Sequence, residues 1–116
     1  MSELKQVIVI RRDLWMRPGK AIAQGAHASL GAVLDKASAE DINDWIESGN
    51  KKVVCKVGSE VELLELQRHA EAAKLPTYLV RDAGYTEVMP NTPTALAIGP
   101  YESNAIDRIT SHLELY

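Results

Sequence analysis

Residues 7–10, Val-Ile-Val-Ile, constrain the fold more than any other segment of the chain, because all four side chains are β-branched and apolar. A strand with one solvated face alternates apolar and polar residues, whereas a continuous apolar run is typical of a strand covered on both faces. Residues 53–57 and 77–80 form two further strand-like runs, and residues 94–98 form a fourth, which Gly99-Pro100 closes. These segments predict a sheet with helices on both sides.

Helical segments lie between most of these strands. Apolar residues recur at spacings of three and four over residues 20–36, which predicts an amphipathic helix. Capping boxes at Ser38 and Ser59 begin two further helices, and residues 105–109 belong to a last one. The order β-α-α-β-α-β-β-α predicts one α/β domain spanning residues 1–116, a three-layer α/β/α sandwich with a largely parallel sheet.

The first predicted helix carries three stripes of different character. The apolar stripe, which we expect to face the core, consists of Ile22, Ala26, Leu30, Val33 and Leu34. Small residues at positions 21, 25, 28 and 32 predict close packing against another helix, the sheet or a partner subunit. A polar stripe contains Lys20, Gln24, His27 and Gly31. Because a lysine in the first turn opposes the helix dipole, the polar stripe is a candidate site, and a solvated flank is the alternative.

The composition is that of a soluble globular protein, with 46% hydrophobic and 25% charged residues. No apolar run is long enough to cross a membrane. The single cysteine, Cys55, excludes an intrachain disulfide and a cysteine cluster for zinc, and we expect neither a metal nor another cofactor. Charged residues within positions 1–15 argue against a secretory signal, so we expect a cytoplasmic protein.

Charge is distributed unevenly along the chain, whose net charge is −3. Residues 1–36 contain six basic and three acidic side chains, whereas residues 37–116 contain seven basic and thirteen acidic ones. The acidic total argues against indiscriminate binding of nucleic acid, but the basic N-terminal part can receive a polyanion. Ordinary solvated charge is the alternative interpretation.

Polar residues also gather between the third and fourth predicted strands, in residues 81–94. Loops at the carboxyl ends of parallel strands are where ligands bind, and the first strand likewise ends in a polar segment, residues 11–13. We therefore expect one cleft to bring Lys20 close to Asp82 and several hydroxyl groups. The alternative for Asp82 is a turn residue that accepts hydrogen bonds from its own backbone N–H groups.

Two segments carry a combined motif of high specificity. The first contains Arg11, Asp13-Leu14, Met16, Gly19-Lys20, Ala23-Gln24 and Ala26-His27-Ala28. The second contains Arg81-Asp82-Ala83-Gly84, Thr86, Pro90, Thr92-Pro93-Thr94 and Leu96-Ala97-Ile98-Gly99-Pro100. In this order and at this separation they resemble the two signatures of the archaeal and eukaryotic type of peptidyl-tRNA hydrolase, and the similarity extends from about Lys5 to Leu115.

The resemblance implies a four-stranded, mixed, mostly parallel sheet whose last strand is antiparallel to the rest, and a homodimer in at least some members. The implied activity is metal-free hydrolysis of the ester that joins a peptide to the 3′ end of tRNA, with peptidyl-tRNA as the partner and recycled tRNA as the outcome. The implied catalytic residues are Lys20, Asp82, Thr86 and Thr94. The residues expected to contact the substrate or the tRNA are Arg11, Arg12, Arg17, Gln24, His27 and Thr92.

The sequence also favours one mechanism. Since no Ser-His-acid or Cys-His pairing is evident, direct attack by water is favoured over an acyl-enzyme. Asp82 is expected to orient or deprotonate the water, and Lys20 to face the oxyanion or the terminal phosphate. Two other functions stay open at this point: a non-catalytic module that binds tRNA or protein on the same fold, and an α/β module that binds a small nucleotide-like ligand.

The chain departs from the family pattern outside the implied catalytic set. Trp15 and Arg17-Pro18 replace smaller or glycine-rich residues, Gly25 replaces a frequent cysteine, and Asn91 replaces a frequent glycine. Tyr85 replaces what is often a basic residue, which removes one phosphate contact.

Overall fold

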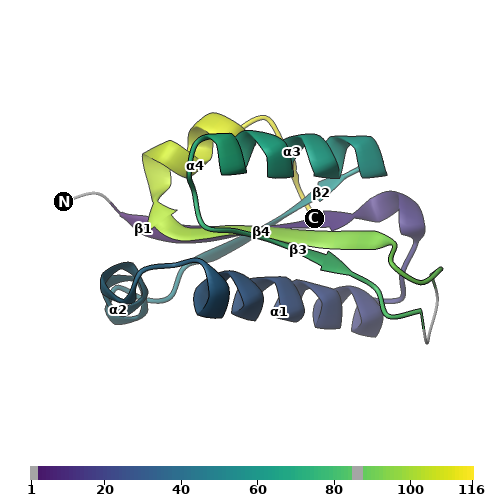
Figure 1. Cartoon of the computed structure of the whole chain (residues 1–116), viewed down its shortest axis with the longest axis horizontal. Coiled ribbons are helices and arrows are strands. Elements are labelled where there is room, and N and C mark those ends of the chain that lie inside the picture. The colour runs from purple at the N-terminus through teal and green to yellow at the C-terminus, as the bar shows by residue number, and fades with distance from the viewer. Residues whose placement is uncertain (1–2, 85–87) are drawn as a thin grey trace.

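The computed structural model describes residues 3–84 and 88–116, which form five strands and four α-helices around one mixed sheet (Figure 1). The strand order across the sheet is β3-β4-β1-β2-β5. The strands are β1 (Leu4–Arg11), β2 (Lys52–Val57), β3 (Thr77–Arg81), β4 (Pro93–Glu102) and β5 (Glu114–Leu115). β1 and β2 are parallel, whereas the pairs β1–β4, β3–β4 and β2–β5 are antiparallel.

Helices cover both faces of the sheet, as Figure 1 shows. One face carries α1 (Pro18–Asp35) and α2 (Ala39–Glu47), and the other carries α3 (Glu60–Ala72) and α4 (Ser103–Thr110). The predicted three-layer α/β/α class is therefore confirmed, with a mixed sheet of five strands instead of four. Among the described residues, no helix has the length and hydrophobicity that crossing a membrane requires.

Two helices begin at the predicted caps. The hydroxyl of Ser38 accepts a hydrogen bond from the N–H of Asp41 at 3.1 Å, and the hydroxyl of Ser59 accepts one from Glu62 at the same distance. Each of these bonds satisfies one N–H group that the first turn of a helix leaves without an intrahelical acceptor. The chain therefore enters α2 and α3 at defined residues.

The central strand β1 contributes to both hydrophobic layers. Val7 and Val9 are buried with the side chains of α3 and α4, and Ile8 and Ile10 are buried with those of α1. Successive side chains of a strand point to opposite faces, so the Val-Ile-Val-Ile run fills both layers at once. This burial confirms that β1 is a strand covered on both sides.

The face of α1 that packs on the sheet is the small-residue stripe, not the apolar stripe that we expected. Buried positions of α1 are Ala21, Gln24, Gly25, Ala28 and Ala32. Ile22 is 72% exposed, Leu30 58% and Leu34 76%, so the prediction that this stripe faces the core is wrong. Small side chains let the helix backbone approach the sheet closely, which leaves the larger ones on the outer side.

The C-terminal third also differs from the prediction. β4 does not end at Gly99-Pro100 but continues through a cis peptide bond between them to Glu102, where it pairs with Leu4 at the start of β1. The short edge strand β5 was not predicted, because its two residues carry no recognisable alternation. The longer β4 holds the start of α4 against the sheet.

Close packing of α1 against β3 gives a first prediction. A Cβ at Gly31 would overlap Cδ2, Cε2 and Cγ of the Tyr78 ring. Because overpacking costs about 1–3 kcal/mol, Gly31→Ala should lower the free energy of unfolding despite the higher helix propensity of alanine. Urea denaturation followed by circular dichroism measures the change.

Gly25 supplies the matched control on the same helix. A Cβ there would meet Ile8 and Ile10 at 3.5 Å, an ordinary contact distance, so Gly25→Ala should be neutral or stabilising by up to about 1 kcal/mol. In a Tyr78→Ala background the cost of Gly31→Ala should disappear. Equal effects of the two glycine substitutions would contradict the proposed overlap.

Candidate active site

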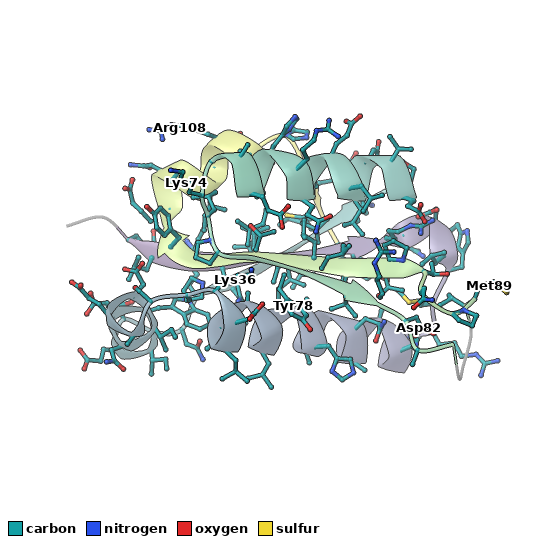
Figure 2. All side chains as sticks on the ribbon, in the orientation of Figure 1. Lys36, Lys74, Tyr78, Asp82, Met89 and Arg108 are labelled. Carbon is teal, nitrogen blue, oxygen red and sulfur yellow. The ribbon has the colours of Figure 1, made fainter. Side chains whose placement is uncertain are left out.

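Lys20 and Asp82 form an ion pair although they are 62 residues apart in the chain. Lys20 lies in the first turn of α1, and Asp82 directly follows β3. The ammonium Nζ of Lys20 donates a hydrogen bond to Oδ1 of Asp82. Figure 2 shows Asp82 at the end of the sheet, beside the start of α1. The structure therefore brings together the two residues that the sequence placed in one cleft.

The carboxylate of Asp82 is held in place by its own loop. Its Oδ2 accepts a hydrogen bond from the N–H of Gly84 at 2.6 Å, and its backbone N–H donates to the carbonyl of Thr92 at 2.9 Å. Gly84 has a φ of +87°, and a Cβ there would lie 2.5 Å from Cγ of Pro90. Glycine is therefore required at position 84 both for the backbone conformation and for space.

This loop shows that Asp82 can be a turn residue and a partner of Lys20 at the same time. One carboxylate oxygen closes a turn of the Asx type with Gly84, and the other binds Lys20. The turn fixes the direction of the carboxylate before any substrate arrives. The Asp-x-Gly spacing in the sequence is the signal that could have identified Gly84 as a positioning residue.

The ion pair also sets the charge state of Asp82. The hydrogen bond from Lys20 is the largest influence and lowers the pKa of the Asp82 carboxyl below its ordinary value. Burial opposes this effect, and the N–H of Gly84 supports it. The Asp82 side chain is only 3% exposed and that of Lys20 14%, so water screens the pair weakly. Asp82 is therefore ionised at neutral pH.

A second buried polar contact connects α1 to β4. Nε2 of Gln24 donates a hydrogen bond of 2.6 Å to the hydroxyl of Thr94. The same hydroxyl lies 3.4 Å from the carbonyl of Val80, on β3. Gln24 is one helical turn after Lys20, so the contact holds the start of α1 in register with the strands beside Asp82.

Arg11, which we expected to contact the substrate, binds groups within the fold. Its guanidinium donates two hydrogen bonds to Asp13, at 3.2 and 2.7 Å, and one to the carbonyl of Pro93 at 3.0 Å. A further contact of 3.4 Å reaches Glu60. Since Arg11 is only 8% exposed, it joins the end of β1 to the start of β4 within the fold.

The remaining predicted site residues lie at the surface or outside the described part of the chain. Arg12, Arg17 and His27 are exposed, and Thr92 is partly buried. Thr86 lies outside the described residues. Within residues 3–84 and 88–116, no group of three or more histidine, cysteine or acidic side chains is arranged to hold a metal ion.

The family model described as peptidyl-tRNA hydrolase PTH2 matches residues 4–116. The peptidyl-tRNA hydrolase of Methanopyrus kandleri is 52% identical over 112 residues, which cover 96% of this chain and 97% of that protein. The protein of the same name from Methanocaldococcus jannaschii is 46% identical over 114 residues, covering 97% and 99%. That of Thermococcus onnurineus is 46% identical over 117 residues, covering 99% of both chains.

The depressed pKa of Asp82 predicts how stability depends on pH. A carboxyl whose pKa is lowered on folding stabilises the folded state above its unfolded pKa of about 3.9, and this stabilisation is lost as the pH falls through the lower folded value. Wild-type protein should therefore exceed Asp82→Asn in free energy of unfolding by a constant amount above about pH 5. The difference should shrink only below about pH 4. Urea titrations between pH 3 and pH 7 measure it, and a difference that is constant over this range contradicts the assignment.

Proposed function

Because the chain belongs to the peptidyl-tRNA hydrolase PTH2 family, it hydrolyses the ester between a peptide and the 3′ end of tRNA, and we propose that Lys20 and Asp82 carry this reaction. The observation that supports the proposal is the ion pair itself, which is shielded from water and connects the first turn of α1 to the end of β3. The non-catalytic binding module is not favoured, because the family model and the similar proteins are named as hydrolases.

The reaction sets clear demands on the site. A water molecule loses one proton as its oxygen adds to the ester carbonyl carbon, and the carbonyl oxygen takes up negative charge. The bond to the ribose oxygen then breaks as that oxygen takes a proton, and the new carboxyl group releases its remaining proton to solvent. The products are the free carboxylate of the peptide and the ribose hydroxyl of the tRNA. A site for this chemistry therefore needs a donor for the oxyanion and a group that orients the water.

Lys20 fits the first of these roles. An ammonium group has three N–H donors, and the bond to Asp82 uses one of them. The two others can reach the developing oxyanion or the terminal phosphate of the substrate. Because the Lys20 side chain is 14% exposed, its charge acts in a weakly screened environment, where electrostatic stabilisation of a transition state is strong.

Asp82 fits the role of an orienting group better than that of a strong general base. Its lowered pKa makes it a weak proton acceptor, and each of its oxygens already accepts one hydrogen bond. Every carboxylate oxygen has a second lone pair, which can bind the attacking water. Asp82 therefore fixes Lys20 and aims the water, and no acyl-enzyme is formed.

The other residues support this pair in our proposal. Thr94 is fully buried, so its hydroxyl acts through the amide of Gln24 and positions the start of α1. Arg11 acts through the carbonyl of Pro93 and positions the start of β4. Thr86, which lies outside the described residues, remains a proposed catalytic residue on the basis of its motif.

Basic residues near the site supply a surface for tRNA in this proposal. Arg12 and Arg17 lie between β1 and α1, and Arg81 precedes Asp82 with its guanidinium donating to the carbonyl of Asn91 at 3.0 Å. Arginine contacts to phosphates add affinity without reading base sequence, which suits an enzyme that accepts many tRNAs. His27 and Thr92 remain candidates for further substrate contacts. Since the substrate arises during translation, we place the reaction in the cytoplasm.

A homodimer is also part of the proposal. The stripe of α1 formed by Ile22, Ala26, Leu30 and Leu34 faces away from the sheet and is exposed along its length. A continuous apolar stripe on a helix is stabilised when a partner covers it. We assign this stripe to a two-fold contact with a second copy of the chain, in which α1 packs against α1.

Activity measurements test the catalytic pair. Lys20→Ala and Asp82→Ala should each lower kcat at least about 100-fold, because each removes an electrostatic or acid–base contribution to the transition state. Release of the acyl amino acid from N-acetyl-aminoacyl-tRNA gives the rate, and circular dichroism verifies folding. The exposed ion pair between Lys51 and Glu3, 2.9 Å long, supplies the controls Lys51→Ala and Glu3→Ala, which should retain normal rates. Normal turnover in both Lys20→Ala and Asp82→Ala would contradict the proposed mechanism.

Sedimentation velocity tests the proposed dimer. Wild-type protein should sediment at twice the mass of the 12.8 kDa chain, and Leu30→Glu should convert it to monomers by placing a charge in the apolar contact. Val61 is similarly exposed, at 65%, but lies on α3 across the sheet, so Val61→Glu should leave the dimer intact. A wild-type monomer at micromolar concentration would contradict the assignment.

A further inference from the structure

The short turn between β1 and α1 presents a large aromatic side chain to solvent. After the 3₁₀ turn of residues 12–14, Trp15 has a φ of +52°, in the left-handed region that glycine favours. For a bulky side chain this conformation is a true outlier and strains the backbone. The neighbouring Met16 is buried and Leu14 packs on the same core cluster, so both flanks of Trp15 are anchored.

The indole of Trp15 is 72% exposed, whereas the other tryptophan, Trp45, is 3% exposed. The guanidinium carbon of Arg12 lies 4.2 Å from the centre of the Trp15 ring and 5.8 Å from that of Tyr116. Arg12 therefore stacks against Trp15 and keeps positive charge beside it. Exposed aromatic rings combined with arginine are the groups on which proteins stack the unpaired bases of RNA.

The position of Trp15 relative to Lys20 and Asp82 limits which part of the substrate the indole can contact. Trp15 precedes Lys20 by five residues, so their Cα atoms are at most about 17 Å apart. The turn after β1 lies at the same end of the molecule as the end of β3 and the start of β4, as Figure 1 shows. A substrate whose ester is held at Lys20 is therefore long enough to place one of its unpaired nucleotides at Trp15.

We propose that Trp15, backed by Arg12, is a stacking site for an unpaired base at the 3′ end of the tRNA. The proposal rests on the proposed function and adds a recognition residue that phosphate contacts do not supply. A strained backbone at Trp15 is consistent with it, because glycine would remove the strain but would also remove the ring. Stacking needs only the face of a base, so the site accepts any nucleotide that occupies this place.

Kinetics of Trp15→Gly and Trp15→Phe test the stacking site. Loss of one base–aromatic stack should raise KM for peptidyl-tRNA roughly tenfold and leave kcat unchanged, since the stack is made equally in ground state and transition state. Trp15→Phe should retain most of the affinity. Ile46→Ala, which removes a 55%-exposed apolar side chain on α2, is the control and should change neither constant.

Thermal unfolding separates this role from a structural one. Because glycine relieves the strain at φ +52°, Trp15→Gly should have an equal or higher Tm than wild-type protein. A structural role predicts the opposite, a lower Tm together with a lower kcat. A normal KM in Trp15→Gly overturns the proposal.

Fluorescence makes the test independent of catalysis. A short single-stranded RNA that ends in CCA should quench the emission of wild-type protein, and the quenching should be absent in Trp15→Phe, which retains only the buried Trp45. If the protein lacked hydrolytic activity but this quenching occurred, the proposed function would fail while the stacking site stood. Equal spectral changes in the two proteins overturn the stacking site alone.

Discussion

The close approach of α1 to the sheet is the constraint on which the site depends. Ala21, Gly25, Ala28 and Ala32 allow it, because their side chains add little volume between the helix backbone and strands β1, β3 and β4. A helix placed farther from the sheet would separate the first-turn Lys20 from Asp82, which the end of β3 fixes. The same small residues therefore determine how closely α1 packs on the sheet and whether Lys20 reaches Asp82.

The ion pair between Lys20 and Asp82 contributes differently to the stability of the fold and to the proposed function. Removing two charges from water is costly, and a shielded salt bridge often contributes little net stability, although the loss of one partner leaves an uncompensated charge. Here the position of the lysine is itself unfavourable, because α1 has no acidic residue in its first turn and no side-chain cap, whereas α2 and α3 have both. Asp82, directly after β3, supplies the negative charge that the first turn of α1 itself lacks.

Much of this arrangement could be predicted from local sequence patterns. The Val-Ile-Val-Ile run identified a strand buried on both faces, the serine caps identified two helix starts, and the two polar segments identified Lys20 and Asp82 as neighbours. These predictions succeed because they depend on the residues themselves or on the general topology of α/β sheets. The predicted orientation of α1 was wrong. Its apolar and small-residue stripes both have helical spacing, so periodicity alone does not show which stripe packs on the sheet. Likewise, the inward direction of Arg11 depends on Asp13, Glu60 and Pro93, which only the folded chain brings together.

The distribution of rigid and exposed groups agrees with the proposal that the chain acts on many tRNAs. In the proposed mechanism the group that orients the water, Asp82, is fixed before binding by Gly84 and Lys20, and the contact between Gln24 and Thr94 fixes the start of α1, which carries Lys20. A fixed dipole or charge does not have to reorganise during the reaction, which is the main source of electrostatic catalysis. The groups proposed to contact the nucleic acid, such as Arg12 and Trp15, lie instead on the surface turn before α1. In the proposal they recognise only features that all tRNAs share, the phosphate charge and the face of a base. Because this turn leads directly into the first turn of α1, which carries Lys20, the proposal predicts that binding of the common end of the substrate places the ester at the same position whatever the attached peptide is.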